Sequence, residues 1–375
     1  MSLAALIVVD EERAGADLTV FGMPLVEYQA RLAQAAGAIH IVIVTTQVPA
    51  PLVAALDRLR SRGLNAVLAR TAIEAAGQVH PDETVLLFEP GCLPENEVID
   101  RLMQSEKCAI ATAALDPALR HQELIDADHS WAGIAYINGA LVRKAAELPG
   151  DWSLSSALLR FAVQDGANRV AIGDSSGMKV HRLSSTGDAI AATQALSGGV
   201  SLAKPSVSGQ MLQPISAIIA RHFARFAVPP IVGDIASVLL LSAVVGLGLA
   251  GWTATALIGF AAAQMVAMIA QRIDKAALSD SPVPGILHRV FPWAGRLLLG
   301  MAGYQMFAGG EGWGAVALAL WLIWELWLAR TAEGRLLADE GSATVLTGAG
   351  LLAGFPLIGL SLALLHSLAD RFRRE

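Results

Sequence analysis

An acidic segment directly after the first apolar run is the earliest place where this chain could do chemistry. It reads Asp10-Glu11-Glu12-Arg13-Ala14-Gly15-Ala16-Asp17. In α/β proteins a glycine-rich loop at this position commonly binds phosphate, whose charge is offset by backbone N–H groups and a lysine. No lysine occurs before Lys107, and the four acids would repel a triphosphate by on the order of several kcal/mol at short range. Arg13 could contact a phosphate, or the segment could be a solvated acidic turn.

A second polar position follows the apolar run that ends at Phe88. Glu89 could hold Mg²⁺, which accepts carboxylate ligands, although a glutamate at a strand end is more commonly a solvated loop residue. Cys92 and Cys108 are the only cysteines, too few for a disulfide scaffold or a cysteine-based zinc site. The histidines show no metal-ligand spacing, so we expect no metal site and no cofactor.

Short apolar runs alternate with helical patterns through residues 1–196. Strands are expected at 3–9, 40–46, 65–69, 83–88, 109–114, 133–138, 170–172 and 180–183. Helical patterns occupy 26–36, 50–63, 95–104, 140–146, 153–165 and 188–196. This alternation predicts a mostly parallel sheet covered by helices on both faces, a Rossmann-like α/β sandwich of three layers.

The remainder of the chain is strongly apolar. Residues 197–213, rich in Gly, Ser and Pro, are predicted to be a linker. Residues 214–226 form an amphipathic pattern typical of a helix at a membrane surface, or of an ordinary interdomain helix. Four stretches, 231–252, 253–270, 290–307 and 313–329, approach the roughly 20 apolar residues that a membrane span needs. Residues 343–368 could be one kinked span or two short helices, so five or six transmembrane helices are expected in domain 214–375.

Composition and charge placement agree with an integral membrane protein. Hydrophobic residues make up 54% of the chain and charged residues 16%, against a usual charged share of about 25%. A net charge of −6 argues against a nucleic-acid partner. The first residues carry no basic start and so do not indicate a signal peptide. The basic loops around Arg272 and Arg330 are predicted to lie on the same side of the membrane as the first domain. We therefore expect a multi-pass protein of the cell inner membrane with its N-terminal domain in the cytoplasm. The sequence does not decide on which side of the membrane the C-terminus lies.

The first half resembles the sugar-phosphate nucleotidyltransferases of the inositol-phosphate cytidylyltransferase type. The resemblance rests on three segments: Phe21-Gly22-Met23-Pro24-Leu25-Val26-Glu27-Tyr28-Gln29, Trp131-Ala132-Gly133-Ile134 and Ser184-Ser185-Thr186-Gly187-Asp188. It implies a GT-A type fold with two metal-binding aspartates. The first falls on the turn that offers Glu89 and Cys92 instead, and the second falls on Ser184. Asp188 matches the family, and we expect it to cap or precede a helix. Asp10, Glu11 and Arg13 take the place of the phosphate loop.

The second half resembles the CDP-alcohol phosphotransferases through Lys204-Pro205, Gln213-Pro214-Ile215-Ser216, Arg221 and Pro229-Pro230. That family's signature, Asp-x-x-Asp-Gly-x-x-Ala-Arg followed by Gly-x-x-x-Asp-x-x-x-Asp, implies four carboxylates that hold divalent metals. The family arginine aligns with Arg272. The acids and glycines of the signature then become Gln264, Ala267, Met268, Gly285, Arg289 and Trp293. No acid remains at the four positions, so metal-dependent transfer is not expected.

Two ionisable residues lie inside predicted spans. Arg296 and Glu325 stand at similar depth, and because buried charges in a bilayer are usually paired, we expect an Arg296–Glu325 pair that joins two helices or lines a polar cavity.

Both halves therefore resemble a fusion of two transferases whose metal ligands are missing. The leading hypothesis is a catalytically inactive relative that supports phospholipid or polar-headgroup synthesis. It would contact membrane lipid and form a homodimer or a heterodimer with an active paralogue. The alternative is an active transferase with altered residues, and only this alternative implies Mg²⁺ and CTP.

Overall fold

The computed structural model describes residues 2–10, 18–115, 123–148, 153–173, 176–200, 207–224, 226, 229–331 and 339–372. The chain divides into two compact units, Met1–Leu196 and Ser197–Glu375. Glu11 and Arg13 of the acidic segment lie outside the described residues.

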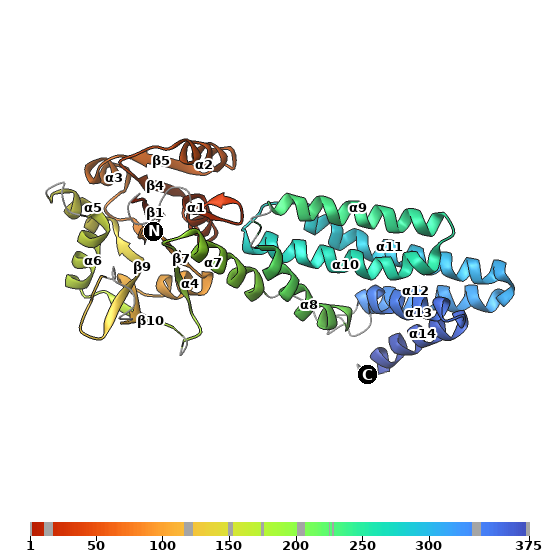
Figure 1. Ribbon diagram of the computed structural model, residues 1–375. Helices are drawn as coiled ribbons and strands as arrows, with labels where there is room; N and C mark the ends of the chain where they lie inside the picture. Colours follow the sequence, from red (N-terminus) through yellow and green to blue (C-terminus); the bar gives the residue numbers. More distant parts are fainter. Residues whose placement is uncertain are drawn as a thin grey trace. The chain divides into compact units, whose positions relative to one another are not determined.

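A mixed seven-stranded sheet forms the centre of the first unit (Figure 1). Its order is β10 (Asn168–Ile172), β8 (Ala109–Ala114), β9 (His129–Asn138), β6 (Thr84–Phe88), β1 (Leu3–Val8), β4 (His40–Val44) and β5 (Asn65–Ala69). β1 pairs in parallel with β4 and β6, whereas β9 runs antiparallel to both of its neighbours. The predicted α/β class and mostly parallel sheet are confirmed. β9 is four residues longer at its start than the predicted 133–138.

Helices cover both faces of this sheet (Figure 1). α3 (Ala72–Gln78), α5 (Gly139–Ala146) and α6 (Leu154–Gln164) pack on the face that carries Leu6, Val42 and Leu87. The other face is covered by α1 (Leu25–Ala35), α2 (Ala50–Ser61) and α4 (Asn96–Met103). Two small antiparallel pairs complete the unit, β2 (Thr19–Val20) with β3 (Met23–Pro24) and β7 (Cys92–Pro94) with β11 (Val180–Arg182). α3 was not predicted, because seven residues give only a short helical pattern.

Helices make up the described part of the second unit. They are α8 (Val207–Ala224), α9 (Pro230–Leu249), α10 (Thr253–Ala276), α11 (Val283–Met306), the π-helix η1 (Phe307–Glu311), α12 (Trp313–Thr331), α13 (Glu340–Leu352) and α14 (Pro356–Phe372). α7 (Thr186–Gly199) reaches past Leu196, and α8 begins inside the range 197–213, whose residues 201–206 lie outside the described chain. The core gathers around Phe260, Phe291 and Leu298.

The last apolar segment resolves into two helices joined by a tight turn. Gly354 adopts φ 78°, a conformation that favours glycine, and α14 begins at Pro356. A Cβ at Gly350 would lie 2.5 Å from the Cα of Gly359, so the helices touch at their backbones. Of the two possibilities left open by the sequence, the pair of short helices is the one observed.

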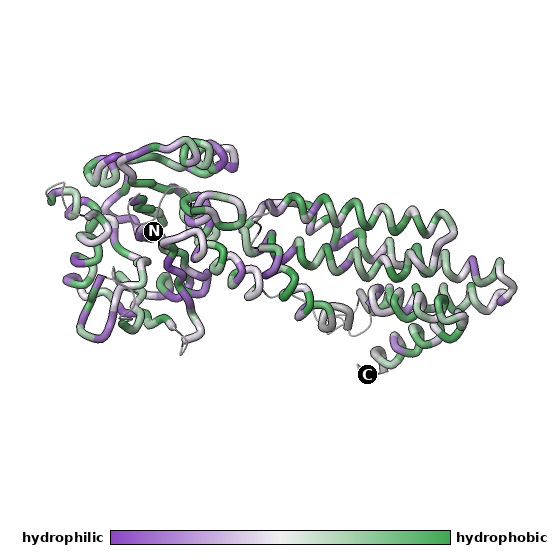
Figure 2. Tube along the Cα trace, viewed as in Figure 1, coloured by the Kyte–Doolittle hydropathy of each residue, from purple (hydrophilic) through white to green (hydrophobic). Residues whose placement is uncertain are grey.

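Apolar residues run along the helices of the second unit (Figure 2). Within the described residues, α9 and α10 are the helices long and apolar enough to cross a membrane, with mean hydropathies of 2.1 and 1.7. α12 and α14 contain the shorter apolar stretches Trp313–Leu328 and Pro356–Ala369. Two of the five or six predicted spans thus meet the length and hydropathy requirement, and the complete transmembrane bundle stays a prediction.

Candidate functional site

Parallel strands bring the predicted nucleotide-site residues to one edge of the sheet. β1 and β6 run side by side and end at Val8 and Phe88. Glu89 follows Phe88 directly, and Asp10 follows Val8 after one intervening residue. In open α/β sheets, ligands bind at the edge where the parallel strands end. The first unit therefore presents these two acids at the edge where a nucleotide would be expected.

The side chain of Glu89 is buried rather than solvated. Its residue is 2% exposed, and its amide donates to the carbonyl of Gly133 on β9 at 2.8 Å. Arg182 of β11 donates from Nη1 to Glu89 Oε2 at 2.5 Å and from Nη2 to the carbonyl of Trp131 at 2.6 Å. The expectation of a solvated loop residue is wrong, because β9 and β11 close over the turn and supply a cation for the carboxylate.

A glycine allows the carboxylate to lie this close to β9. Gly133 adopts φ 96°, which L side chains rarely adopt. A Cβ at this position would lie 2.9 Å from Glu89 Oε2 and 3.1 Å from the Cβ of Cys92. The segment Trp131-Ala132-Gly133-Ile134, which carries part of the family resemblance, is thus the wall against which Glu89 and Cys92 pack.

Cys92 is a packing residue. It is fully buried on β7, and its thiol approaches the carbonyl of Ala132 at 3.7 Å. The carbonyl of Cys92 accepts a hydrogen bond from the side chain of Gln29 at 2.6 Å, which ties the turn to α1. Burial raises the pKa of the thiol to about 12; the nearby charge of Arg182 lowers it and that of Glu89 raises it. A thiol with this pKa stays protonated and is a poor nucleophile or metal ligand at neutral pH.

Ser184 and Asp188 form a helix cap. The Asp188 carboxylate accepts from the hydroxyl of Ser184 at 2.7 Å and from the amides of Ser184 and Ser185 at 3.0 and 2.9 Å. In return the Ser185 hydroxyl accepts from the Asp188 amide at 3.2 Å. This reciprocal arrangement is a capping box at the start of α7. These hydrogen bonds, led by the one from the Ser184 side chain, hold the pKa of Asp188 below its usual range.

The edge of the sheet where β1 and β6 end therefore holds one buried carboxylate, Glu89, whose charge is balanced by Arg182. The second family position, Ser184, carries a neutral hydroxyl. The carboxylate of Asp188 accepts hydrogen bonds from that hydroxyl and from the Ser185 amide. Among the described residues no three His, Cys, Asp or Glu gather closely enough to hold a metal. Sequence reasoning missed Arg182. It stands 93 positions from Glu89, and only the pairing of β11 with β7 reveals that the two meet.

The phosphotransferase positions are spread over two helices. Gln264, Ala267 and Met268 lie on α10, and Gly285, Arg289 and Trp293 lie on α11. Arg289 and Trp293 are exposed.

Arg272, on which the alignment was anchored, is buried near the end of α10. It donates to the Ser216 hydroxyl at 3.0 Å, to the carbonyl of Gln213 at 3.2 Å and to the carbonyl of Val200. The arginine thus joins α10 to α8 through neutral acceptors.

The structure gives Arg296 a different acidic partner from the expected one. Arg296 donates to Glu340 Oε1 at 2.8 Å, and its guanidinium lies over the ring of Trp293 at 5.4 Å. Glu325, the expected partner, accepts a hydrogen bond from Trp321 Nε1 at 3.2 Å. Hydropathy alone could not identify Glu340, because it begins α13 and lies outside the predicted spans.

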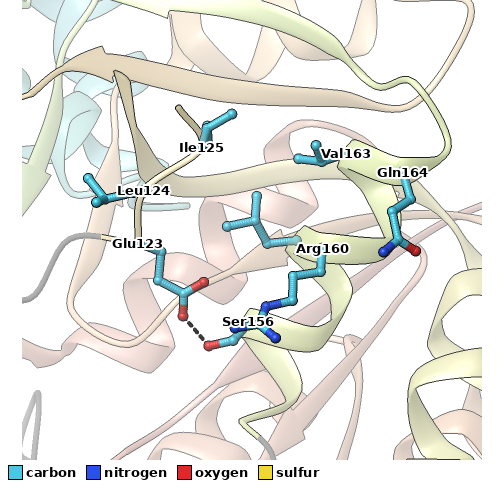
Figure 3. Close-up of a pocket in the computed structure, with 8 residues that line it drawn as sticks. Glu123, Leu124, Ile125, Ser156, Arg160, Val163 and Gln164 are labelled. Atoms are coloured by element: carbon cyan, nitrogen blue, oxygen red, sulfur yellow. Dashed lines mark hydrogen bonds between the residues drawn. The ribbon is translucent and has the colours of Figure 1, made fainter. Parts of the chain in front are cut away.

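Two cavities of the first unit are lined by residues other than the predicted nucleotide-site positions. One, of about 440 Å³, is lined by Glu123, Leu124, Ile125 and side chains of α6, with Ser156 donating to Glu123 (Figure 3). The other, of about 710 Å³, lies between α4 and β10, where Arg101, Lys107 and Arg169 approach it. Neither is lined by Asp10, Glu89 or Asp188.

Comparisons with known proteins complete the description. No protein-family model and no curated protein matches the chain. Among solved structures, the inositol-1-phosphate CTP transferase from T. maritima is 13% identical with a TM-score of 0.39, covering 50% of this chain and 91% of its own. The 4-diphosphocytidyl-2C-methyl-D-erythritol synthase from Anaerococcus prevotii is 15% identical with a TM-score of 0.37, covering 52% and 98%. A protein from Bacillus anthracis, assigned as a glucose-1-phosphate thymidylyltransferase, is 10% identical with a TM-score of 0.41, covering 54% and 98%.

Proposed function

We propose that this chain is a membrane protein with a nucleotidyltransferase-like unit that no longer performs metal-dependent nucleotidyl transfer. It serves instead as a partner or regulatory subunit in phospholipid or polar-headgroup synthesis. The observation that carries this proposal is the buried Glu89–Arg182 pair at the edge of the sheet.

Nucleotidyl transfer needs a divalent cation to offset the charge that develops on the triphosphate. At the position where the resemblance implies a metal-binding acid, Glu89 is already neutralised by a guanidinium at 2.5 Å. A metal bound there would have to displace Arg182 or accept repulsion from it. The second implied ligand, Ser184, carries no charge and donates to Asp188. The pair therefore occupies the site in place of an ion.

The helical unit supports a location in lipid. A core helix of a soluble protein is mostly buried, whereas only 28% of the apolar stretch of α9 and 33% of that of α10 are buried in this chain. Large apolar side chains point outward on most of its helices: Ile235, Leu239, Leu249, Trp293, Leu320, Trp324, Ile358 and Leu365. Exposed apolar surface on this scale needs a partner or a bilayer to cover it. Alkaline extraction of membranes should leave the full chain in the pellet; release into the supernatant contradicts a membrane-spanning unit.

The activity test uses the purified full chain with CTP, Mg²⁺ and a panel of sugar and polyol phosphates. We expect no pyrophosphate release above that of a heat-denatured sample. Release that is lost on changing Glu89→Ala would establish the alternative, an active transferase with altered residues. Calorimetry with CTP and CDP separates loss of turnover from loss of nucleotide binding.

The partner role is tested by recovering the tagged full chain from membranes after mild cross-linking. We expect a phosphotransferase-family or lipid-synthesis protein to accompany it, either as a heterodimer or alongside a homodimer. Recovery of the chain without any such protein would count against the regulatory role while leaving the inactive site unaffected.

A further inference from the structure

Two aspartates are buried where the start of α9 meets the end of α10. Asp234 is 1% exposed and Asp274 is 4% exposed. The helices approach closely at this point, because a Cβ on Gly233 would lie 2.9 Å from the Cβ of Ala270. The two carboxylates lie within electrostatic range of each other. Neither aspartate is one of the positions at which the family resemblance implies a metal ligand.

Three of the four carboxylate oxygens lack a hydrogen-bond partner among the described residues. They are Oδ1 of Asp234 and both oxygens of Asp274, none of which has a hydrogen bond of normal geometry. The carboxyl of Asp274 nevertheless lies close enough to the side chains of Asp234 and Ser279 to interact with both. The fourth, Asp234 Oδ2, accepts from the hydroxyl of Ser281 in the loop before α11. Ser279 of the same loop lies beside Asp274 and accepts from the Ser281 amide at 3.3 Å. Buried polar atoms in native proteins are nearly always satisfied, so this cluster is incomplete.

The neighbouring cations do not complete it. Arg272 stands two positions before Asp274, but its guanidinium donates to Ser216 and to the carbonyls of Val200 and Gln213. Lys275 is exposed. No described arginine, lysine or histidine forms an ion pair with either aspartate. Buried carboxylates without a counter-charge are too costly to be kept ionised, so a cation must be supplied from outside the chain or a proton must be shared.

We propose that Asp234 and Asp274, with the hydroxyls of Ser279 and Ser281, bind one divalent metal ion of the Mg²⁺ type. The donors are all oxygen, which selects hard cations over zinc or copper. Two ionised carboxylates are balanced by one charge of +2, whereas a monovalent ion would leave one negative charge buried. Mg²⁺ is commonly held by one or two carboxylates with water in its remaining positions. The ion would join α9, α10 and the loop that leads into α11.

This site goes beyond the proposed function. It uses none of the positions Gln264, Ala267, Gly285, Arg289 or Trp293 that the family resemblance assigns. An ion here would bind whether or not the first unit turns over nucleotide, so each proposal can fail without the other.

The test titrates MnCl₂ into the purified, metal-stripped full chain in detergent and counts free Mn²⁺ by electron paramagnetic resonance. We expect one bound Mn²⁺ per chain, displaced by Mg²⁺, and a rise in melting temperature on binding. Asp274→Asn and Asp234→Asn each remove the charge of a direct ligand and should weaken binding by about 100-fold or more, the upper end of the effect of losing a supporting residue. Ser281→Ala should weaken binding by roughly 10-fold, because Ser281 also hydrogen-bonds to Asp234. Asp280→Asn is the matched control, because Asp280 is an exposed acid of the same loop; it should leave binding unchanged.

Ser281→Ala keeps both aspartates and serves if the Asn variants do not fold. A wild-type chain that binds no Mn²⁺ at about 1 mM, a concentration at which only very weak sites stay empty, would overturn the proposal. So would equal binding by the wild type, Asp274→Asn and Ser281→Ala. Higher thermal stability of metal-free Asp274→Asn, with no Mn²⁺ bound by the wild type, would identify a shared proton instead.

Discussion

Replacing Arg182 with methionine tests whether the Glu89 pair is as buried as the structure indicates. Methionine keeps most of the apolar length of the arginine stem and removes the charge. Glu89, 2% exposed, would then hold an unmatched carboxylate beside β9. Removing one partner of a fully buried pair costs about 3–5 kcal/mol. The side chain of Arg182 is 27% exposed, so water reaches the gap, and we expect a loss of about 2–3 kcal/mol.

Hydrogen exchange of the full chain is the suitable assay, because it reads the first unit separately from the helices. The amides to follow are those of β6 and β9, Thr84–Phe88 and His129–Asn138. Since about 1.36 kcal/mol corresponds to a factor of ten, the most protected of these amides should exchange roughly 30- to 150-fold faster in Arg182→Met. The double variant with Glu89→Gln should recover much of this loss, because no buried charge is left unmatched.

Arg169→Met is the matched control. Arg169 pairs with Asp126, and their side chains are 47% and 35% exposed. An exposed pair contributes about 0–1 kcal/mol, so exchange should rise by no more than about fivefold. If Arg182→Met and Arg169→Met behave alike, Glu89 is accessible to water and the case against a metal at this edge fails.

Three further outcomes are expected. Cys92 should resist iodoacetamide at about pH 8 until the chain is denatured, because burial raises its pKa to about 12, while half-buried Cys108 should react slowly; peptide mass spectrometry checks both. Asp188→Ala should lower the free energy of unfolding by about 1 kcal/mol at neutral pH. Since the folded pKa of Asp188 is depressed, that contribution is present above its usual pKa of about 3.9. It is lost as pH falls through the lowered value, so urea denaturation curves of the two proteins should converge at acidic pH. Gly350→Ala should destabilise the α13–α14 pair by about 1–3 kcal/mol, whereas Gly246→Ala, where a Cβ meets nothing within 4 Å, should be neutral or slightly stabilising in thermal unfolding.

Apolar runs were enough to place most strands of the first unit. Buried parallel strands read as continuous apolar segments, and β1, β4 and β6 lie within one or two residues of their predicted ranges. The reversal of β9 could not be predicted, because strand direction depends on how the preceding connection returns to the sheet and leaves no periodic signal. The Glu89–Arg182 pair could not be predicted for the same reason, because the two residues are 93 positions apart in the sequence.

In the helical unit, hydropathy located helices but not their polar contacts. α11 begins at Val283, seven residues before the predicted span. Pro284 falls in its first turn, where proline needs no amide partner, and this start signal was not used. The early start places Arg289 and Arg296 on one helix. The partner of Arg296 is Glu340, at the start of α13, because ion pairs follow helix packing rather than depth along a hydropathy profile.

The same rule of electrostatics leads to opposite inferences in the two units. At Glu89 the chain supplies its own cation, and we infer that a metal would have to compete with Arg182 for the carboxylate. At Asp234 and Asp274 the chain supplies two buried carboxylates and turns its nearest arginine toward carbonyl groups. The positions at which the family resemblance implies metal ligands would therefore be a poor guide to where this protein could bind an ion. Unmatched buried charge is the better guide, because the energetic cost of leaving it unmatched does not depend on which family the residues resemble.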